Sequence, residues 1–387
     1  MFKWELMDEA ITKLDRIRLA KFILTTKRFT NGPEVKKFES NWNEWLGSRN
    51  SLFVSSGSTA NFLLVSAVKE KYGLKEGAKV LVPACTWMTN VAPIIQLGLK
   101  PIFCDINLEN YSFSDSGLEE ISKIHPDIEV IFISHLLGLP GNTQGCRKFF
   151  PKAILLDDIC ESHGITDPWG DKIGSNSTGS TFSFYFGHHM TTIEGGMVST
   201  NDEELYDLMK MKRSHGLARE SLYFRKYSSL YPDIDKSFLF ITDGYNFRNH
   251  EVCAKLGNSQ LRRLDSNIRV RRENFSRYFD IVSQFEDILY CPSFTQNNSS
   301  FCFPLVVRDR KDYLPLKESL VRRNVEFRPI VGGNLLRHPF LEKYCIEGKS
   351  DASLANILND QGIYVGNSQF VGEKHLAILK AALEDLR

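Results

Sequence analysis

Between about residues 50 and 200, short apolar runs of strand length alternate with longer stretches of helical periodicity. In one such stretch, Ala60, Leu63, Leu64, Ala67 and Val68 fall on a single helical face. Several of these runs are nearly continuous in Val, Ile, Leu or Phe, as is typical of strands covered on both faces. The runs are SLFVSS, KVLVPA, KPIFCDI, IEVIFIS, AILLDD, STFSFYFG and GGMVST. The alternation predicts a doubly wound α/β domain with a mainly parallel sheet.

After about residue 260 the pattern changes to that of a smaller α+β domain. A long charged helix at RRLDSNIRVRRENFSRYFDIVSQF precedes a strand at FCFPLVVR, a helix at KDYLPLKESLVRRN and a strand at VEFRPIV. We therefore predict a large domain over residues 1–260, including an N-terminal helix, and a small C-terminal domain over 261–387. The stretch 220–236 is polar and rich in Tyr without a clear period, and is expected to be a loop or lid that lines the pocket.

Charge narrows the classes of partner. The chain has 48 basic and 47 acidic side chains, and no dense basic block, so nucleic acid is not an expected partner. The N-terminal segment places charges in every turn around Ile11, Leu14, Ile17 and Leu19, which favours an amphipathic helix over a secretory signal. No apolar run is long enough to cross a bilayer. A cytoplasmic protein without membrane contact is predicted.

Eight cysteines are scattered along the chain without a C-x-x-C or C-x-C pair. This spacing argues against a zinc site, an iron–sulfur cluster and a disulfide framework. We expect reduced and mostly buried thiols.

Two segments at predicted strand ends carry polar groups. Ser55–Thr59, SSGST, lies between a strand and a helix, where free N–H groups and the helix dipole suit a phosphate, although an ordinary helix cap has the same pattern. Asp157 and Asp158 end the strand AILLDD. A carboxylate there can keep a pyridine nitrogen protonated, but it can also be a cap or a metal ligand.

The segment TFSFYFGHHMTTIEGGMVST distinguishes among these readings. Ser183 stands five residues before His188, and Glu194 with two glycines follows six residues after it. With SSGSTA, CTWMT, LLDDICES, RSHG, DGYNFR and FRPIVGGN, this segment resembles the DegT/DnrJ/EryC1/StrS family of sugar aminotransferases. The resemblance implies a large domain of the fold-type I, aspartate aminotransferase-like class that uses pyridoxal phosphate.

His188 stands where the aminotransferases of this family have the lysine that bonds to the cofactor. Imidazole cannot form that stable bond, but it can move a proton near neutral pH. The histidine resembles that of the GDP-4-keto-6-deoxymannose 3-dehydratase subgroup, which implies noncovalent pyridoxal or pyridoxamine phosphate. A second histidine-bearing subgroup, acting on CDP-sugars, has an iron–sulfur cluster held by a cysteine set that this chain lacks.

By resemblance, the cofactor phosphate is bound by Gly57, Ser58 and Ser183. Asn246 is expected to reach it from the neighbouring subunit of a homodimer with shared active sites.

The resemblance also implies contacts to the cofactor ring. Trp87 stacks on it, Asp158 rather than Asp157 pairs with its nitrogen, and Glu161 lies near its hydroxyl. His215, Arg219 and Arg328 are expected to contact substrate.

These roles imply a lyase that removes the C3 hydroxyl of a 4-keto-6-deoxy nucleotide sugar, with L-glutamate regenerating pyridoxamine phosphate. His188 is the expected base, assisted by Asp158. For His188 alone, a solvated turn or a metal site shared with His189 are the alternatives, and we expect no metal and a structural His189. A 4-aminotransferase and a non-catalytic nucleotide-sugar-binding homologue remain the competing functions.

Overall fold

Seven strands form the large sheet of the computed structural model, which describes residues 2–344 and 352–387. Their order is β1-β7-β6-β5-β4-β2-β3, and β7 alone runs antiparallel to its neighbours. The strands are β1 (Asn50–Val54), β2 (Lys79–Pro83), β3 (Lys100–Cys104), β4 (Val130–Ser134), β5 (Ile154–Asp158), β6 (Gly179–Ser183) and β7 (Gly196–Thr200). All seven coincide with the predicted apolar runs. The mainly parallel sheet is thereby confirmed.

Helices cover both faces of the sheet, since strands β4, β6 and β7 are buried at every position. In the large unit they are α2 (Pro33–Leu46), α3 (Gly57–Lys71), α4 (Met88–Gln96), α5 (Asp115–Ile124), α6 (Thr143–Phe149) and α7 (Glu203–Arg213). Two further helices, α9 (Glu251–Leu261) and α10 (Leu264–Val282), lead to the second unit.

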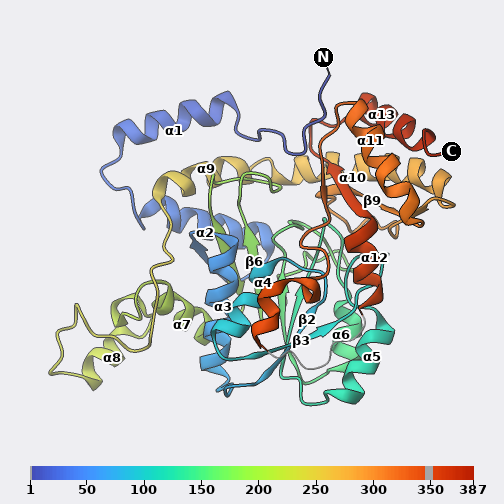
Figure 1. The fold of residues 1–387 in the computed structure, drawn as a ribbon. Helices are drawn as coiled ribbons and strands as arrows, with labels where there is room; N and C mark the ends of the chain where they lie inside the picture. The colour runs from blue at the N-terminus through green and yellow to red at the C-terminus, as the bar shows by residue number, and fades with distance from the viewer. Residues whose placement is uncertain (1, 345–351) are drawn as a thin grey trace.

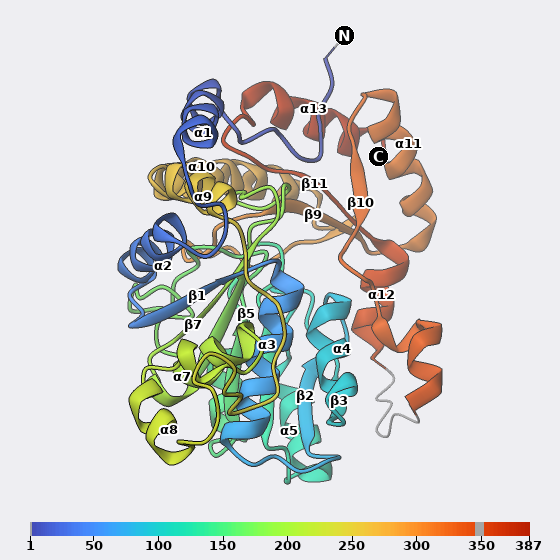
Figure 2. The ribbon, with the colours of Figure 1, turned by 90° about the vertical axis from the view of Figure 1, so that its left-hand side faces the viewer.

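The second unit has a four-stranded antiparallel sheet in the order β10-β11-β9-β8. Its strands are β8 (Leu289–Tyr290), β9 (Cys302–Val307), β10 (Phe327–Pro329) and β11 (Gly362–Gly366), and its helices are α11 (Tyr313–Arg322), α12 (Ser353–Gln361) and α13 (Glu373–Glu384). Figure 2 shows this sheet above the carboxyl ends of the large one. Trp4 is 1% exposed within its core. The division at residue 260 stays a prediction.

Two segments differ from simple expectation. The stretch 220–236 contains a helix, α8 (Phe224–Leu230), because Ser221 and Leu222 hydrogen-bond to the Asp207 carboxylate of α7 and fix its start. It projects from the large unit in Figure 1 and does not line the cavity described below. The N-terminal helix α1 (Lys13–Thr25) forms, but Leu14 and Ile17 lie exposed on it.

The seven cysteines within the described ranges are free thiols, and Cys345 lies outside those ranges. No helix in the described parts of the chain is long and apolar enough to cross a membrane.

Candidate active site

A cavity of about 320 Å³ lies where the carboxyl ends of β5 and β6 meet the start of α3, beneath the small sheet. Carboxyl ends of parallel strands are where open α/β sheets bind ligands. Most of the residues singled out in the sequence meet here, although they are spread over some 270 positions. They are Gly57, Ser58, Trp87, Asp158, Glu161, Ser183, His188 and Arg328.

One end of the cavity is a cradle for an anion. Ser56 caps α3 through its hydroxyl, which accepts from the Thr59 N–H at 3.1 Å. A Cβ on Gly57 would lie 2.6 Å from the Cβ of Ser183, so a side chain would fill the space between helix and strand. The helix dipole and the N–H groups of its first turn then face the Ser183 hydroxyl, which is an arrangement that suits a phosphate.

The two aspartates at the end of β5 have different surroundings because successive strand residues point to opposite faces. Asp157 is hydrogen-bonded to Nε2 of the buried His135 at 3.1 Å. Asp158 lines the cavity, and its two oxygens accept from Nδ2 of Asn61 at 2.9 Å and from the Cys160 N–H at 3.0 Å. These bonds fix the Asp158 carboxylate at the cavity wall.

Glu161 follows Asp158 by three residues, in the loop after β5. One of its oxygens accepts from the Leu137 N–H at 3.2 Å, and Leu137 has the unusual φ of 57° that aims this group at the carboxyl. Loss of water contact raises the pKa of Glu161 to about 7, and the charge of Asp158 acts in the same direction. The Leu137 N–H opposes the shift. Near neutral pH this carboxyl can therefore hold or release a proton.

His188 lies in the turn after β6, with its ring against the cavity. Its Nδ1 is 3.1 Å from the main-chain oxygen of Ser183. A carbonyl can only accept, so Nδ1 carries the proton and Nε2 has the free lone pair of a neutral ring. Burial lowers the pKa of His188 to about 4, against the opposing effect of the Ser183 carbonyl. The side chain is thus a neutral base at neutral pH.

The neighbouring His189 has structural surroundings. It is 1% exposed, and its Nε2 donates to the Ser299 main-chain oxygen at 3.1 Å. Burial also holds its pKa well below the ordinary range. The described residues include no group of three His, Cys, Asp or Glu side chains that could hold a metal ion.

Sequence reasoning missed His163, which is fully buried near both histidines. Its ring centroid lies 5.2 Å from that of His189 and 6.3 Å from that of His188. The only sequence signal was its position two residues after Glu161, which did not reveal the contact. Met7, Tyr185, Phe301 and Tyr364 also line the cavity and were not singled out.

Three of the residues expected to bind ligands lie outside the cavity of their own chain. Asn246 is exposed and accepts from Nε of Arg248 at 3.1 Å. His215 lies beside the same arginine, with Nε2 3.3 Å from Nη2 of Arg248. Arg219 hydrogen-bonds to the Ser237 main-chain oxygen at 3.4 Å. Within one chain, none of the three reaches the cradle.

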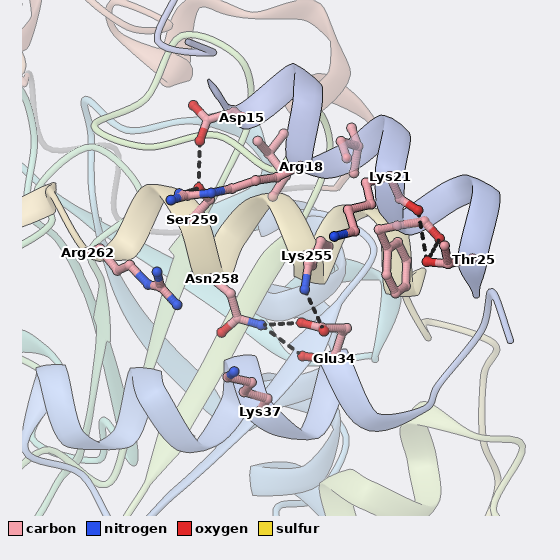
Figure 3. A pocket seen from close by; sticks show the side chains of 13 residues that line it. Asp15, Arg18, Lys21, Thr25, Glu34, Lys37, Lys255, Asn258, Ser259 and Arg262 are labelled. Carbon is pink, nitrogen blue, oxygen red and sulfur yellow. Dashed lines mark hydrogen bonds and ion pairs between the residues drawn. The ribbon is translucent and has the colours of Figure 1, made fainter. Parts of the chain in front are cut away.

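A second cavity, of about 370 Å³, lies between α1, α2 and α9 and is drawn in Figure 3. Its carboxylates are already paired, Glu34 with Lys255 at 2.8 Å and Asp15 with Arg263. None of the candidate catalytic, cofactor-binding or substrate-binding residues lines it. The chemistry of this chain therefore belongs to the smaller cavity.

Comparison with known proteins agrees with this geometry. Residues 11–377 match the model of the DegT/DnrJ/EryC1/StrS aminotransferase family. The GDP-4-keto-6-deoxy-D-mannose 3-dehydratase of Escherichia coli O55:H7 is 34% identical over 359 residues, which is 90% of this chain and 91% of that protein.

Solved structures of GDP-4-keto-6-deoxymannose-3-dehydratase are similar over the whole fold. A variant with bound GDP-perosamine has a TM-score of 0.90 at 31% identity, covering 98% of this chain and 100% of that one. A form with a trapped PLP-glutamate geminal diamine has a TM-score of 0.88 at 30% identity, covering all of both chains. The predicted fold class is confirmed.

Proposed function

The chain belongs to the DegT/DnrJ/EryC1/StrS aminotransferase family, and we propose that it is a pyridoxamine-phosphate-dependent 3-dehydratase of a 4-keto-6-deoxy nucleotide sugar. GDP-4-keto-6-deoxy-D-mannose or a close GDP-sugar is the preferred substrate. The observation that carries this proposal is the neutral imidazole of His188 at the position of the family's lysine, with its lone pair on Nε2. No lysine is among the described residues that line the cavity.

The residues present fit the cofactor. The turn of Gly57 and Ser58, with the Ser183 hydroxyl, would hold its phosphate, because the cradle has no room for a side chain at position 57. Asp158, fixed by Asn61, would hold a proton on the ring nitrogen. When bound, pyridoxamine phosphate supplies an amine that condenses with the C4 ketone and a ring that accepts electrons.

One aromatic and one acidic side chain would complete the binding of the cofactor ring. Trp87 offers a face that is 56% exposed in the single chain, and Glu161 would lie near the ring hydroxyl. Arg328 is at the cavity wall and is a candidate contact for the sugar or its phosphates.

His188 would then move one proton twice. Nε2 takes it from the carbon that bears the cofactor amine and delivers it to the hydroxyl that leaves sugar C3 as water. The Ser183 carbonyl keeps Nδ1 protonated throughout, so Nε2 serves first as the base and then as the acid. Hydrolysis would release a 3-deoxy-4-keto sugar, ammonia and pyridoxal phosphate, and L-glutamate would restore the amine form of the cofactor with release of α-ketoglutarate.

The active unit is a homodimer in which Asn246 completes the phosphate site of the other subunit. Exposed aromatic side chains at the cavity wall, Trp87 and Tyr185, support a partner at this surface. His215 and Arg219, which lie outside their own cavity, would contact substrate in the same way. The enzyme acts in the cytoplasm and supplies dideoxysugars for surface polysaccharide such as lipopolysaccharide O-antigen or capsule.

One assay separates this function from its competitors. Purified protein with cofactor, L-glutamate and a panel of 4-keto nucleotide sugars is expected to release both ammonia and α-ketoglutarate. A 4-aminotransferase releases the keto acid without ammonia, and a binding protein releases neither. Either of those results contradicts the proposal.

A further inference from the structure

The N-terminal segment of residues 4–10, here called the strap, crosses from the small sheet to α9 over the turn that carries His188. Trp4 fixes its start, because Nε1 donates to the Gly366 main-chain oxygen at 3.1 Å and the ring is buried. Ala10 fixes its end, since its main-chain oxygen accepts from Nε2 of Gln260 at 3.0 Å. The strap is therefore held at both ends.

Between these anchors, Met7 packs against the backbone of Gly187. A Cβ at position 187 would lie 2.0 Å from Sδ and 3.1 Å from Cγ of Met7. The space behind Met7 and His188 is a cavity of only about 20 Å³, which is too small for the methionine to retreat into. Met7 can occupy its place only because residue 187 is glycine.

Met7 also lines the main cavity beside His188. If Nε2 of His188 moves the proton, the reacting atoms lie within hydrogen-bond reach of it. A side chain that borders His188 on the cavity side then borders the sugar. A thioether offers no hydrogen-bond donor and adapts its shape, so it suits a methyl group better than a hydroxymethyl group.

We propose that Met7 is a specificity-determining residue, which forms an apolar wall of the sugar subsite and selects a methyl-bearing, 6-deoxy sugar. Gly187 serves this wall by leaving room for it. The inference rests on the proposed function, since it takes a nucleotide sugar as the ligand.

The test compares equilibrium binding of GDP-perosamine, a 4-amino-6-deoxy sugar nucleotide, with binding of GDP. Met7→Ala is expected to weaken GDP-perosamine binding about tenfold, as the loss of one buried apolar contact does, while GDP binding stays unchanged. Met7→Leu should stay within about threefold of the native protein, because volume and polarity are kept. Met7→Gln, which keeps the length but adds an amide, should lose as much as Met7→Ala.

Gly187→Ala provides an independent arm, because its methyl group displaces Met7. It should reproduce the loss, and the double variant with Met7→Ala should be no weaker than either single variant, since both remove the same contact. Glu5→Gln, in the same strap but with an exposed side chain, is the matched control and should bind both ligands as the native protein does.

The outcomes are distinguishable. If the native protein binds both ligands and Met7→Ala binds GDP-perosamine as tightly as the native protein, the inference is wrong but the proposed function stands. The same holds if the losses of affinity in Met7→Ala and Gly187→Ala add in the double variant. A native protein that binds neither ligand contradicts the proposed function, and the inference with it.

Discussion

Nδ1 of His188 donates to the main-chain oxygen of Ser183 across 3.1 Å, and this bond sets the tautomer of the proposed base. The Cβ of the same serine stands against Gly57 at the anion cradle. Ser183 thus connects the group that would hold a phosphate to the group that would move a proton. Any change that shifts β6 is expected to affect both.

The role of position 188 can be separated from that of position 189. His188→Asn should lower the rate of sugar dehydration by about 10²–10⁴-fold while cofactor binding persists, because a general base is lost and a polar group is kept. His189→Asn should retain activity within about tenfold, since its ring only donates to Ser299. Steady-state rates of both variants check this. A dead His189→Asn beside an active His188→Asn would show that the second histidine is the base.

His188→Lys should change how the cofactor is held. An amine at this position can bond to the aldehyde of pyridoxal phosphate, so we expect a yellow protein with impaired dehydration. Borohydride reduction and peptide mapping should locate an adduct at residue 188 in this variant. The same adduct at the active site of the native protein would contradict the noncovalent mode.

Glu161 should determine the pH dependence near neutrality. Its pKa is raised to about 7, whereas that of His188 is lowered to about 4, so the base is neutral well before the Glu161 carboxyl ionises. In Glu161→Gln, an inflection of kcat/KM near pH 7 should disappear. A profile that is unchanged in this variant would exclude Glu161 as its origin.

The same group gives a stability test in the cofactor-free protein. Because the folded pKa lies above that of the unfolded chain, the folded state keeps a proton that the unfolded state has lost. The stability from this proton is complete below the unfolded pKa and falls as pH rises toward 7. As pH rises from 4.5 to 8, the native protein should lose this stability and Glu161→Gln should not. The unfolding free energy of Glu161→Gln minus that of the native protein, measured by urea denaturation, should therefore increase by roughly 1–3 kcal/mol over this range.

Gly57→Ala should weaken the cradle. The added methyl group would lie 2.6 Å from the Ser183 Cβ and 3.1 Å from Sγ of Cys160, so helix and strand must separate. We expect the affinity for pyridoxamine phosphate to fall at least about tenfold, as measured by fluorescence titration, because the phosphate contacts are made by backbone groups at this junction. Gly372→Ala, where nothing lies within 4 Å, is the control. If Gly57→Ala and Gly372→Ala bind pyridoxamine phosphate equally well, the cradle is not the phosphate site.

Subunit complementation tests the shared site. Asn246 is exposed and does not line the cavity of its own chain, so Asn246→Ala should inactivate the partner's site rather than its own. Mixing this variant with His188→Asn should restore part of the dehydration rate, because hybrid dimers contain one intact site. No recovery despite demonstrated subunit exchange would count against the arrangement.

Much of this molecule could be predicted from the sequence because the signals are local. Seven runs of strand length predicted the seven strands of the large sheet, and the signal was strongest where a strand covered on both faces is nearly all apolar, as in β4. The spacing of Ser183, His188 and Glu194 carried the resemblance that identified the proposed base, and SSGST placed the cradle at a helix start. Asp157 and Asp158 could be distinguished only by resemblance, and the strand alternation in the structure gives them opposite surroundings.

Only tertiary structure decided what comes from distant parts of the chain. Met7 meets Gly187, and Leu137 meets Glu161, through contacts that no periodicity encodes. The helix in 220–236 likewise depends on Asp207 of α7, outside its own segment. The protonation states of His188 and Glu161 are likewise set by tertiary structure. Their residue types fix what can titrate, but the water excluded by packing and the fixed Ser183 and Leu137 dipoles decide at which pH they do.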